Sequence, residues 1–366
     1  MDALTTPSNW QKVRLGDILS YEQPTKFLVA TTQYLQKGFT PILTAGKTFI
    51  LGYTNDKHGI YTNIPVIIFD DFTTDSKMVN FPFKVKSSAI KILSLRDNNQ
   101  ADLKYIYEKL TLLKHQVTDH KRYWIDEFSN IEILLPPLNE QIAIANILSG
   151  LDRYLYSLDA LILKKESVKK ALSFELLSQR KRLKGFNQAW QKVRLGDILS
   201  YEQPTKFLVA TTQYLQKGFT PILTAGKTFI LGYTNDKHGI YTNIPVIIFD
   251  DFTTDSKMVN FPFKVKSSAI KILSLRDNNQ ADLKYIYEKL TLLKHQVTDH
   301  KRYWIDEFSN IEILLPPLNE QIAIANILSG LDHEIASLKN KKRQFENIKK
   351  ALNHDLMSAK IRVLNK

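Results

Sequence analysis

Two stretches of the chain show an apolar pattern in alternating steps of three and four, the seam spacing of a coiled coil. The first runs from residue 138 to about residue 183, and each follows a Pro-Pro pair, which suits the first turn of a helix. We predict two long helices of about 45 residues, spanning roughly 65–70 Å each. The predicted seam residues are Leu148, Leu151, Leu155, Leu158, Ile162, Leu172, Leu328, Leu331, Ile335, Leu338, Phe345 and Leu352.

Ahead of each predicted helix, short runs rich in β-branched and aromatic residues predict strands. In the first half these runs are TPILTAGKTFILGYTND, IPVIIFDDF and FPFKVKSSAIKIL. Residues 101–118 predict a helix, and residues 126–135 return to strand. Strands and helices do not alternate regularly, so the pattern indicates an α+β fold.

The chain contains a perfect internal repeat. Residues 10–152 recur without a mismatch as residues 190–332, at a constant offset of 180. The chain therefore consists of two successive units, each made of a globular part followed by a long helix. An antiparallel pairing of the two helices would relate the halves by a pseudo-two-fold axis. The alternative is that each helix packs on its own domain, although its length exceeds what so small a domain covers.

Composition limits the chemistry that this chain can perform. It has 366 residues, which suggests two domains, and no cysteine, which excludes disulfides and thiolate chemistry. The N-terminal sequence lacks the pattern of a signal peptide, and no apolar run approaches the ~18 residues of a membrane span. These features predict a soluble protein of the cytoplasm.

The basic charge is concentrated on the two helical segments. The chain carries +13 overall, yet residues 10–152 and their copy carry only +1 each. Residues 153–189 and 333–366 carry +6 each. A basic balance favours nucleic acid or an acidic surface as the partner. One interpretation is that Lys164, Lys165, Lys169 and Lys170 supply non-specific electrostatic attraction to DNA.

No motif for catalysis or metal binding is present. Gly46-Lys47-Thr48 contains part of a phosphate-binding loop, but the glycine needed five residues before Gly46 is Pro41. The acids in DDFTTDSK (residues 70–77) are too tightly spaced for a nuclease metal cluster, and the histidines show no metal-ligand spacing. The sequence also lacks the Asn-Pro-Pro-Phe or Asp-Pro-Pro-Tyr motif of an adenine methyltransferase. We therefore predict no catalytic residue and no metal site.

Basic, polar and aromatic residues interleave in the predicted loops, where they could reach phosphates or base edges of DNA. For any single lysine, a solubilising surface role is the simpler interpretation. The candidates are Lys26, Lys37, Lys47, Asn55, Lys57, His58, Tyr61, Lys77, Lys84, Lys86, Ser87, Lys121, Arg122 and Tyr123, with Lys206, Lys217, Lys227, Asn235, Lys237, His238, Tyr241, Lys257, Lys264, Lys266, Ser267, Lys301, Arg302 and Tyr303 in the second copy.

Two motifs resemble the specificity subunit of type I restriction–modification enzymes. One is W-x-x-V-x-L-G-D-I from Trp10, and the other is P-P-L-x-E-Q-x-x-I-A-x-x-L-x-x-L-D from Pro136; both recur 180 residues later. The resemblance covers essentially the whole chain. It implies target-recognition domains within residues 1–136 and 186–316, and conserved helices within residues 137–185 and 317–366. The family usually carries two different recognition domains, whereas these are identical.

The resemblance also implies partners and a bacterial defence role through DNA methylation. Each recognition domain would bind half of a bipartite site in double-stranded DNA, and the helices would dock two methyltransferase subunits. This chain would bind no cofactor itself. S-adenosylmethionine would come with the methyltransferase, and ATP and Mg with a restriction subunit where one is present. The alternatives are a stand-alone DNA-binding or regulatory protein and a purely structural scaffold.

Overall fold

The computed structural model describes residue 7 and residues 9–46, 48–113, 122–210, 212–226, 228–293 and 302–363. Two compact units form: unit 1 joins Met1–Asp159 with Asn340–Lys366, and unit 2 is Ala160–Lys339. We call residues 10–137 module 1 and residues 190–317 module 2. Each unit holds one module and parts of both long helices. The predicted boundaries at 136/137 and 316/317 separate modules from helices and stay a prediction.

Each module contains three small sheets. The central sheet of module 1 has the order β2-β8-β5-β6 and is antiparallel throughout. A second sheet, β4-β3-β7, joins an antiparallel hairpin to a parallel strand. The strands of module 1 are β1 (Gln11–Arg14), β2 (Leu19–Glu22), β3 (Thr40–Leu43), β4 (Ile50–Thr54), β5 (Val66–Asp70), β6 (Ser76–Val79), β7 (Lys84–Val85), β8 (Ile90–Leu95) and β9 (Glu132–Leu135).

The third sheet pairs β1 with β9, so the start of the module meets the strand that leads into the long helix. Short helices complete the module: α1 (Leu15–Ile18), α2 (Leu103–Leu112), α3 (Tyr123–Asp126) and two 3₁₀ turns, Pro24–Phe27 and Phe128–Asn130. Module 2 repeats this order with β10 (Gln191–Arg194), β11 (Leu199–Glu202), β12 (Thr220–Leu223), β13 (Ile230–Thr234), β14 (Val246–Asp250), β15 (Ser256–Val259), β16 (Lys264–Val265), β17 (Ile270–Leu275), β18 (Glu312–Leu315), α5 (Leu195–Ile198), α6 (Leu283–Leu292) and α7 (Tyr303–Asp306).

The central sheet is covered on both faces, which explains why β5 is buried throughout and why its first four residues are apolar. Alternate side chains of a strand point to opposite faces. Ile67 and Phe69 therefore join one core with α2, whereas Val66 and Ile68 join a second core toward the β4-β3-β7 sheet. The two cores fix the register of β5 from both sides.

One of the predictions for module 1 needs correction, and another is met by a shorter element. The predicted strand over residues 126–135 is wrong for its first half, where α3 and a 3₁₀ turn precede β9. Trp124 and Phe128 lie one helical turn apart, and both rings contact Phe69, so core packing favours a helical turn there. The predicted helix over residues 101–118 is α2, which Asp102 caps by accepting the Tyr105 N–H at 2.8 Å. The part of this prediction beyond residue 113 lies outside the described residues.

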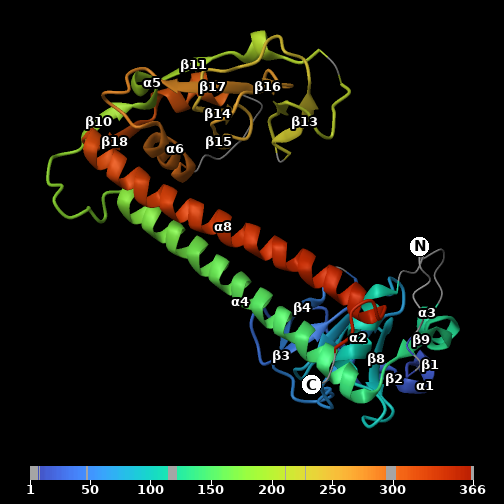
Figure 1. The fold of residues 1–366 in the computed structure, drawn as a ribbon. Helices are drawn as coiled ribbons and strands as arrows, with labels where there is room; N and C mark the ends of the chain where they lie inside the picture. Colours follow the sequence, from blue (N-terminus) through green and yellow to red (C-terminus); the bar gives the residue numbers. More distant parts are fainter. Residues whose placement is uncertain are drawn as a thin grey trace. The chain divides into compact units, whose positions relative to one another are not determined.

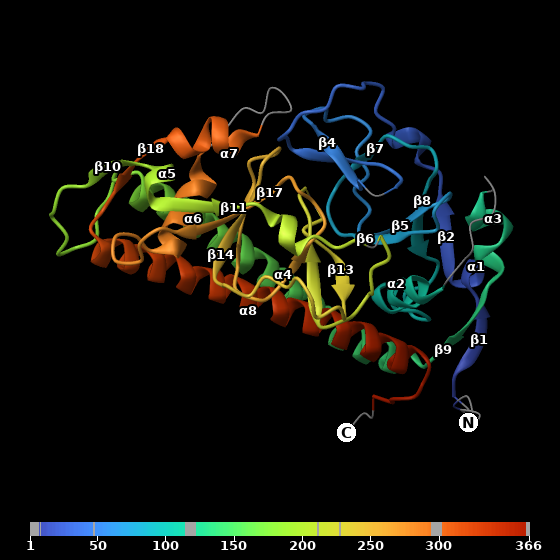
Figure 2. The same cartoon turned by 90° about the horizontal axis from the view of Figure 1, so that it is seen from above.

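The two long helices are α4 (Leu138–Leu177) and α8 (Leu318–Met357), each 40 residues long. Both end before the predicted residue, because Gln179 and Ala359 turn the chain into the left-handed region with φ of 63° and 59°. In each unit the start of one helix packs antiparallel against the end of the other (Figures 1 and 2). Among the described helices, none combines the length and apolarity needed to cross a bilayer.

Contacts within each unit hold the helices together. In unit 1 the rings of Tyr154 and Phe345 lie 4.6 Å apart, and Lys342 Nζ lies 2.7 Å from Asp159. In unit 2, Lys165 pairs with Glu334 and Lys339 with Glu166, each at 2.6 Å. The predicted class is confirmed: an α+β fold with two copies of one domain and two long helices of coiled-coil type. All twelve predicted seam residues are buried or half-buried.

Candidate nucleic-acid interface

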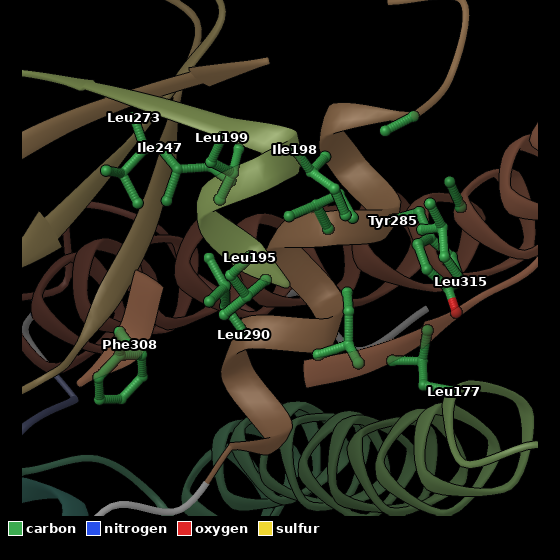
Figure 3. Close-up of a cluster of buried hydrophobic side chains, with 14 of the residues drawn as sticks. Leu177, Leu195, Ile198, Leu199, Ile247, Leu273, Tyr285, Leu290, Phe308 and Leu315 are labelled. Atoms are coloured by element: carbon green, nitrogen blue, oxygen red, sulfur yellow. The ribbon is translucent and has the colours of Figure 1, made fainter. Parts of the chain in front are cut away.

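The end of each long helix is built into the module that the other long helix leaves. In unit 2, Leu176 and Leu177 of α4 lie in the core of module 2, in the same cluster as Leu290 and Leu315, and Figure 3 draws Leu177 among these side chains. In unit 1, Leu356 and Met357 of α8 join the corresponding core of module 1. Each module therefore completes its core with a helix end that comes from the other half of the sequence.

A buried charge network fixes this contact in unit 1. Glu108 of α2 is 1 % exposed and accepts from Lys104 at 2.6 Å, from Lys349 at 3.1 Å and from the Asn353 amide at 3.1 Å. Asp152 of α4 lies 2.6 Å from Lys104 and 2.7 Å from Lys349. Burial raises the pKa of Asp152, but hydrogen bonds from the two lysines outweigh that effect and lower it. The network joins α2, α4 and α8.

Unit 2 repeats the network with one substitution. Lys284 lies 2.7 Å from Glu288 and 2.8 Å from Asp332, whereas Lys169 lies 3.4 Å from Glu288 and 2.5 Å from Asp332. Ser173 stands where unit 1 has Asn353. Lys169 and Lys349 belong to the recurring KKAL sequence, so this motif is a docking motif for α2 and α6.

A second docking contact follows each helix. Arg362 donates to both carboxylate oxygens of Glu140 at 2.6 and 2.8 Å, and the Trp10 indole donates to the same carboxylate at 3.3 Å. Arg182 makes the equivalent bidentate contact with Glu320 at 3.1 and 2.6 Å. A bidentate guanidinium–carboxylate contact adds geometric specificity. It fixes the chain just beyond each helix end.

The helix lysines that we considered for attraction to DNA differ in their surroundings. Lys165 and Lys169 lie in ion pairs inside unit 2, so acids of that unit already balance part of their charge. Lys164 and Lys170 are exposed. Part of the +6 charge of each segment therefore balances acids of the adjoining module and helix.

Removing the central carboxylates should destabilise helix docking strongly. We expect Glu108→Ala with Glu288→Ala to lower the free energy of unfolding by about 3 kcal/mol per unit, because loss of one partner leaves buried charges uncompensated. Chemical denaturation followed by circular dichroism measures this. The control is Glu132→Ala, which removes the exposed Lys12–Glu132 pair and should cost about 0–1 kcal/mol. Equal effects of the two changes would show that the network does not hold the helix end.

A buried lysine where the end of α8 docks on module 1 should make the free energy of unfolding change with pH in the alkaline range. Lys109 Nζ donates to the Met357 carbonyl at 2.7 Å, and burial lowers its pKa from 10.5 to about 8. Between pH 8 and 10.5 the unfolded chain binds this proton and the folded chain does not, so stability rises with pH.

We expect the midpoint of chemical denaturation to rise between pH 8 and pH 9, below the pH range in which the tyrosines of the unfolded chain begin to lose their protons. The gain should be on the order of 1–3 kcal/mol. Burial also lowers the pKa of Lys289 in module 2. The variant Lys109→Met/Lys289→Met should lose the rise, and parallel pH profiles of the two proteins would contradict this assignment.

Three of the predicted DNA-contacting residues lie inside module 1. Tyr61 is 4 % exposed and packs edge-on against Phe27 and stacked on Phe83. Tyr123 is fully buried, and Lys84 is 5 % exposed. Their copies Tyr241, Tyr303 and Lys264 are buried likewise. The prediction that these six side chains contact DNA is wrong for the described structure, because they are buried inside the modules.

The remaining candidates differ in exposure and surroundings. Ser87 accepts the Ala89 N–H at 3.1 Å within a turn. Lys77 is half-buried with its Nζ 4.5 Å from the centre of the Phe49 ring. Lys26 and Arg122 are exposed, Lys86 is half-buried, and the copies Lys206, Lys257, Lys266, Ser267 and Arg302 occupy matching positions. Lys47, Lys121, Lys227 and Lys301 lie outside the described residues.

The structure brings four exposed candidates together in two neighbouring segments. Lys37 lies in residues 35–39, and Asn55, Lys57 and His58 lie in residues 55–59, all of them exposed. We call these segments the tip loops; in module 2 they are residues 215–219 and 235–239, with Lys217, Asn235, Lys237 and His238. The Asn55 side-chain oxygen accepts the Phe39 N–H at 3.2 Å and joins the two segments.

The buried Lys84 holds the second tip loop in place through hydrogen bonds from inside the module. Its Nζ donates to Asp56 at 2.5 Å and to the His58 carbonyl at 2.8 Å. The hydrogen bond from Lys84 lowers the pKa of Asp56 to about 2. Gly59 has φ of +58°, and a Cβ there would lie 2.9 Å from the Lys26 carbonyl oxygen, so glycine is required. Lys84 thus positions the loop rather than contacting DNA.

The acids near the partial phosphate-loop motif have structural roles. Asp70 accepts the N–H groups of Gly46 at 2.9 Å and Phe72 at 3.0 Å, which closes two turns. Asp71 forms a buried ion pair with Lys91 at 2.8 Å and accepts the Trp124 N–H at 2.7 Å. Within the described ranges, no group of three or more acidic or histidine side chains is placed to hold a metal ion.

Sequence reasoning missed the most exposed aromatic side chain of the module. Phe39 is 89 % exposed at the end of the first tip loop, and Phe219 is 88 % exposed in the copy. The only signal in the sequence is a phenylalanine after Lys37-Gly38, between a polar loop and a strand. That pattern does not distinguish an exposed ring from a core ring.

The architecture defines a class of protein: a duplicated α+β domain whose two long helices dock reciprocally, with a cationic tip on each domain. Comparison with known proteins agrees. Residues 7–165 and 187–347 each match the type I restriction modification DNA specificity domain. The chain therefore belongs to the family of type I restriction–modification specificity subunits. As a member it is a non-catalytic subunit that recognises DNA sequence.

Individual relatives support this placement. The chain is 48 % identical over 156 residues to the type I restriction enzyme EcoR124I/EcoR124II specificity subunit of Escherichia coli, a match covering 41 % of this chain and only 38 % of that subunit. It is 24 % identical over its whole length to the MjaVIII specificity subunit of Methanocaldococcus jannaschii, covering 96 % of it. The S subunit structure from M. genitalium shares the fold, with a TM-score of 0.70 over 97 % of both chains at 18 % identity.

Proposed function

We propose that this chain directs a type I restriction–modification complex to a bipartite DNA site with a spacer of unspecified sequence. Each module would bind one half-site through its tip loops. The observation that carries the proposal is the exact duplication of a DNA-specificity domain, with the same exposed cations in both copies. A chain with two identical binding surfaces is suited to a site with two equivalent halves.

The tip loops have the chemistry of a DNA-contacting surface. Lys37 and Lys57 would contact phosphates, while Asn55 and His58 would lie near base edges. The one acid in these loops, Asp56, is paired with Lys84, so it does not repel a phosphate backbone. The exposed Lys26 and Arg122 would add further phosphate contacts. Because each module is nearly neutral overall, the local arrangement of charge must supply the attraction.

The partners follow from the family. Two methyltransferase subunits would supply S-adenosylmethionine, and restriction subunits, where present, would supply ATP and Mg. The exposed faces of α4 and α8 are the surfaces that we assign to these subunits. The predicted seam residues, from Leu148 to Leu352, would hold the helix pair that carries them.

Selection from a library of duplexes tests the proposal. The library carries two randomised segments separated by every spacer from four to ten base pairs, and the bait is the full chain alone or with its methyltransferase. We expect one consensus with two defined halves and an undefined spacer. Recovery of a single continuous half-site, methylated by no partner, would favour a stand-alone DNA-binding protein instead. Recovery of random sequence would contradict the proposal.

A further inference from the structure

One side chain on each module is exposed in a way that the fold does not require. Phe39 and Phe219 project almost their whole rings into solvent, whereas the other aromatic residues close to them in the module are partly or fully buried. Scattered apolar residues on a surface need no explanation by themselves. These two differ because their backbone is fixed from several sides.

The backbone that carries Phe39 is held to the β3–β4 hairpin. Leu35 and Tyr53 exchange two backbone hydrogen bonds of 2.9 Å, and Asn55 binds the Phe39 N–H. A Cβ at Gly38 would lie 2.9 Å from the Tyr53 Cβ, so the loop is seated closely on the strand. Thr40, the next residue, is 6 % exposed and begins β3. The ring is therefore presented from a well-anchored turn.

The surroundings of the ring favour a nucleic acid over a protein partner. Lys37, Lys57 and His58 lie in the same two loops, and the only acid there is held by Lys84. Leu35, at 45 % exposed, adds a second apolar side chain to the first tip loop. In Figures 1 and 2, β13, which leads into the second tip loop of module 2, lies on the side of its module away from β10 and β18.

We propose that Phe39 and Phe219 each insert a ring against a base step of the bound half-site and partly unstack it. This inference rests on the proposed function, since it requires that the modules bind duplex DNA. Apolar wedges act in this way in DNA-bending proteins, and lysines beside a wedge can contact the flanking phosphates. Lys37 and Lys57 would hold these phosphates here. The wedge would give a preference for an easily unstacked pyrimidine–purine step in each half-site.

The proposal predicts how much DNA affinity is lost when the ring is removed from both modules. Stacking of a base on an aromatic ring changes affinity by about 5- to 150-fold on removal of the ring, the equivalent of about 1–3 kcal/mol. Both half-sites would lose this contribution in a double variant. Because each ring is already in solvent, its removal takes nothing from the core, and the variant should fold like the parent.

The experiment uses the full chain and a duplex of the sequence selected from the split-site library. 2-Aminopurine replaces one adenine at a time through both half-sites, and its fluorescence reports unstacking. We expect enhanced fluorescence at one step in each half-site. Phe39→Ala/Phe219→Ala should abolish the enhancement and weaken binding by about 25-fold or more, since each ring contributes about 5-fold at least, whereas Phe39→Leu/Phe219→Leu should retain much of both. The control is Tyr156→Ala, which removes an aromatic side chain that is 78 % exposed on α4 and should change neither.

The possible outcomes distinguish failure of the wedge from failure of the proposed function. Selection of a defined site without any 2-aminopurine enhancement would overturn the wedge and leave the proposed function standing. Equal affinity of the alanine variant and the parent for that site would do the same. A variant that binds DNA normally but loses partner-dependent methylation would assign Phe39 to a protein interface and overturn the wedge. Failure of the parent to select any site would overturn both proposals. Matching thermal denaturation curves would show that the variants are folded.

Discussion

The DNA site that this chain selects from the duplex library is expected to be an interrupted palindrome. Identical modules must recognise identical base patterns, because direct recognition depends on the side chains and their geometry. The antiparallel helix pairing predicted from the sequence would relate the modules by a two-fold axis. A two-fold axis normal to the DNA exchanges the strands, so each module would bind the same pattern 5′ to 3′ on opposite strands.

Turning one half-site around should abolish specific binding. Each mismatch costs about 1–3 kcal/mol, so a direct repeat that mismatches a few base pairs should bind roughly a thousandfold more weakly or worse. The measurement compares inverted and direct repeats of the selected half-site at fixed spacing, by competition at one salt concentration. An inverted site with one extra spacer base pair is the second probe, since it rotates a half-site by roughly 34–36°. Stronger selection of the direct repeat would refute the two-fold relation without touching the family assignment.

The second half of the chain is expected to form a homodimer when it is made alone. Residues 186–366 contain module 2 and all of α8. The end of α8 lies about 36 Å along the helix from Asp332, so it does not reach the docking site of its own module. A second copy offers an identical site, with Glu288, Asp332 and Glu320 in the places of Glu108, Asp152 and Glu140.

Light scattering after gel filtration measures the state of this half-chain. We expect a mass of two copies, although the Tyr154–Phe345 contact and the Lys342–Asp159 pair of the parent chain have no equivalent in the dimer. Glu288→Lys should leave the half-chain unable to dimerise, because three cations would then meet at one buried point. The control is Glu202→Lys, an equal charge change at an exposed position of β11, which should remain dimeric. A monomeric parent half-chain would contradict reciprocal docking.

The amino-acid sequence alone determined the plan of the molecule. The exact repeat of residues 10–152 requires two domains of one fold, and the spacing from Leu148 to Leu172 predicts a long helix with one apolar stripe. Both are local or periodic properties, so they are visible along the chain. The recognition motifs that begin at Trp10 and Pro136 are local as well, which is why the family could be inferred before any fold was known.

The tertiary structure decided which residues of the candidate interface are available. Tyr61 and Phe39 are both aromatic residues near lysines in the sequence, yet one lies in the core and the other in solvent. Whether each ring is buried or exposed depends on residues that are distant in the sequence, such as Phe83, which stacks on Tyr61, and Asn55, which binds the Phe39 N–H. The burial of Lys84 also depends on residues distant in the sequence, because its ammonium group donates to Asp56 and to the His58 carbonyl.

The role of the helix charge was also decided by long-range contacts. The sequence shows that KKAL recurs and that the segments are basic, but not where those lysines lie. Lys349 meets Glu108 across 241 residues of chain, and Lys169 meets Glu288 across 119. A buried carboxylate needs a partner charge to be stable. Only the fold identifies that partner, since no periodicity along the chain connects the two.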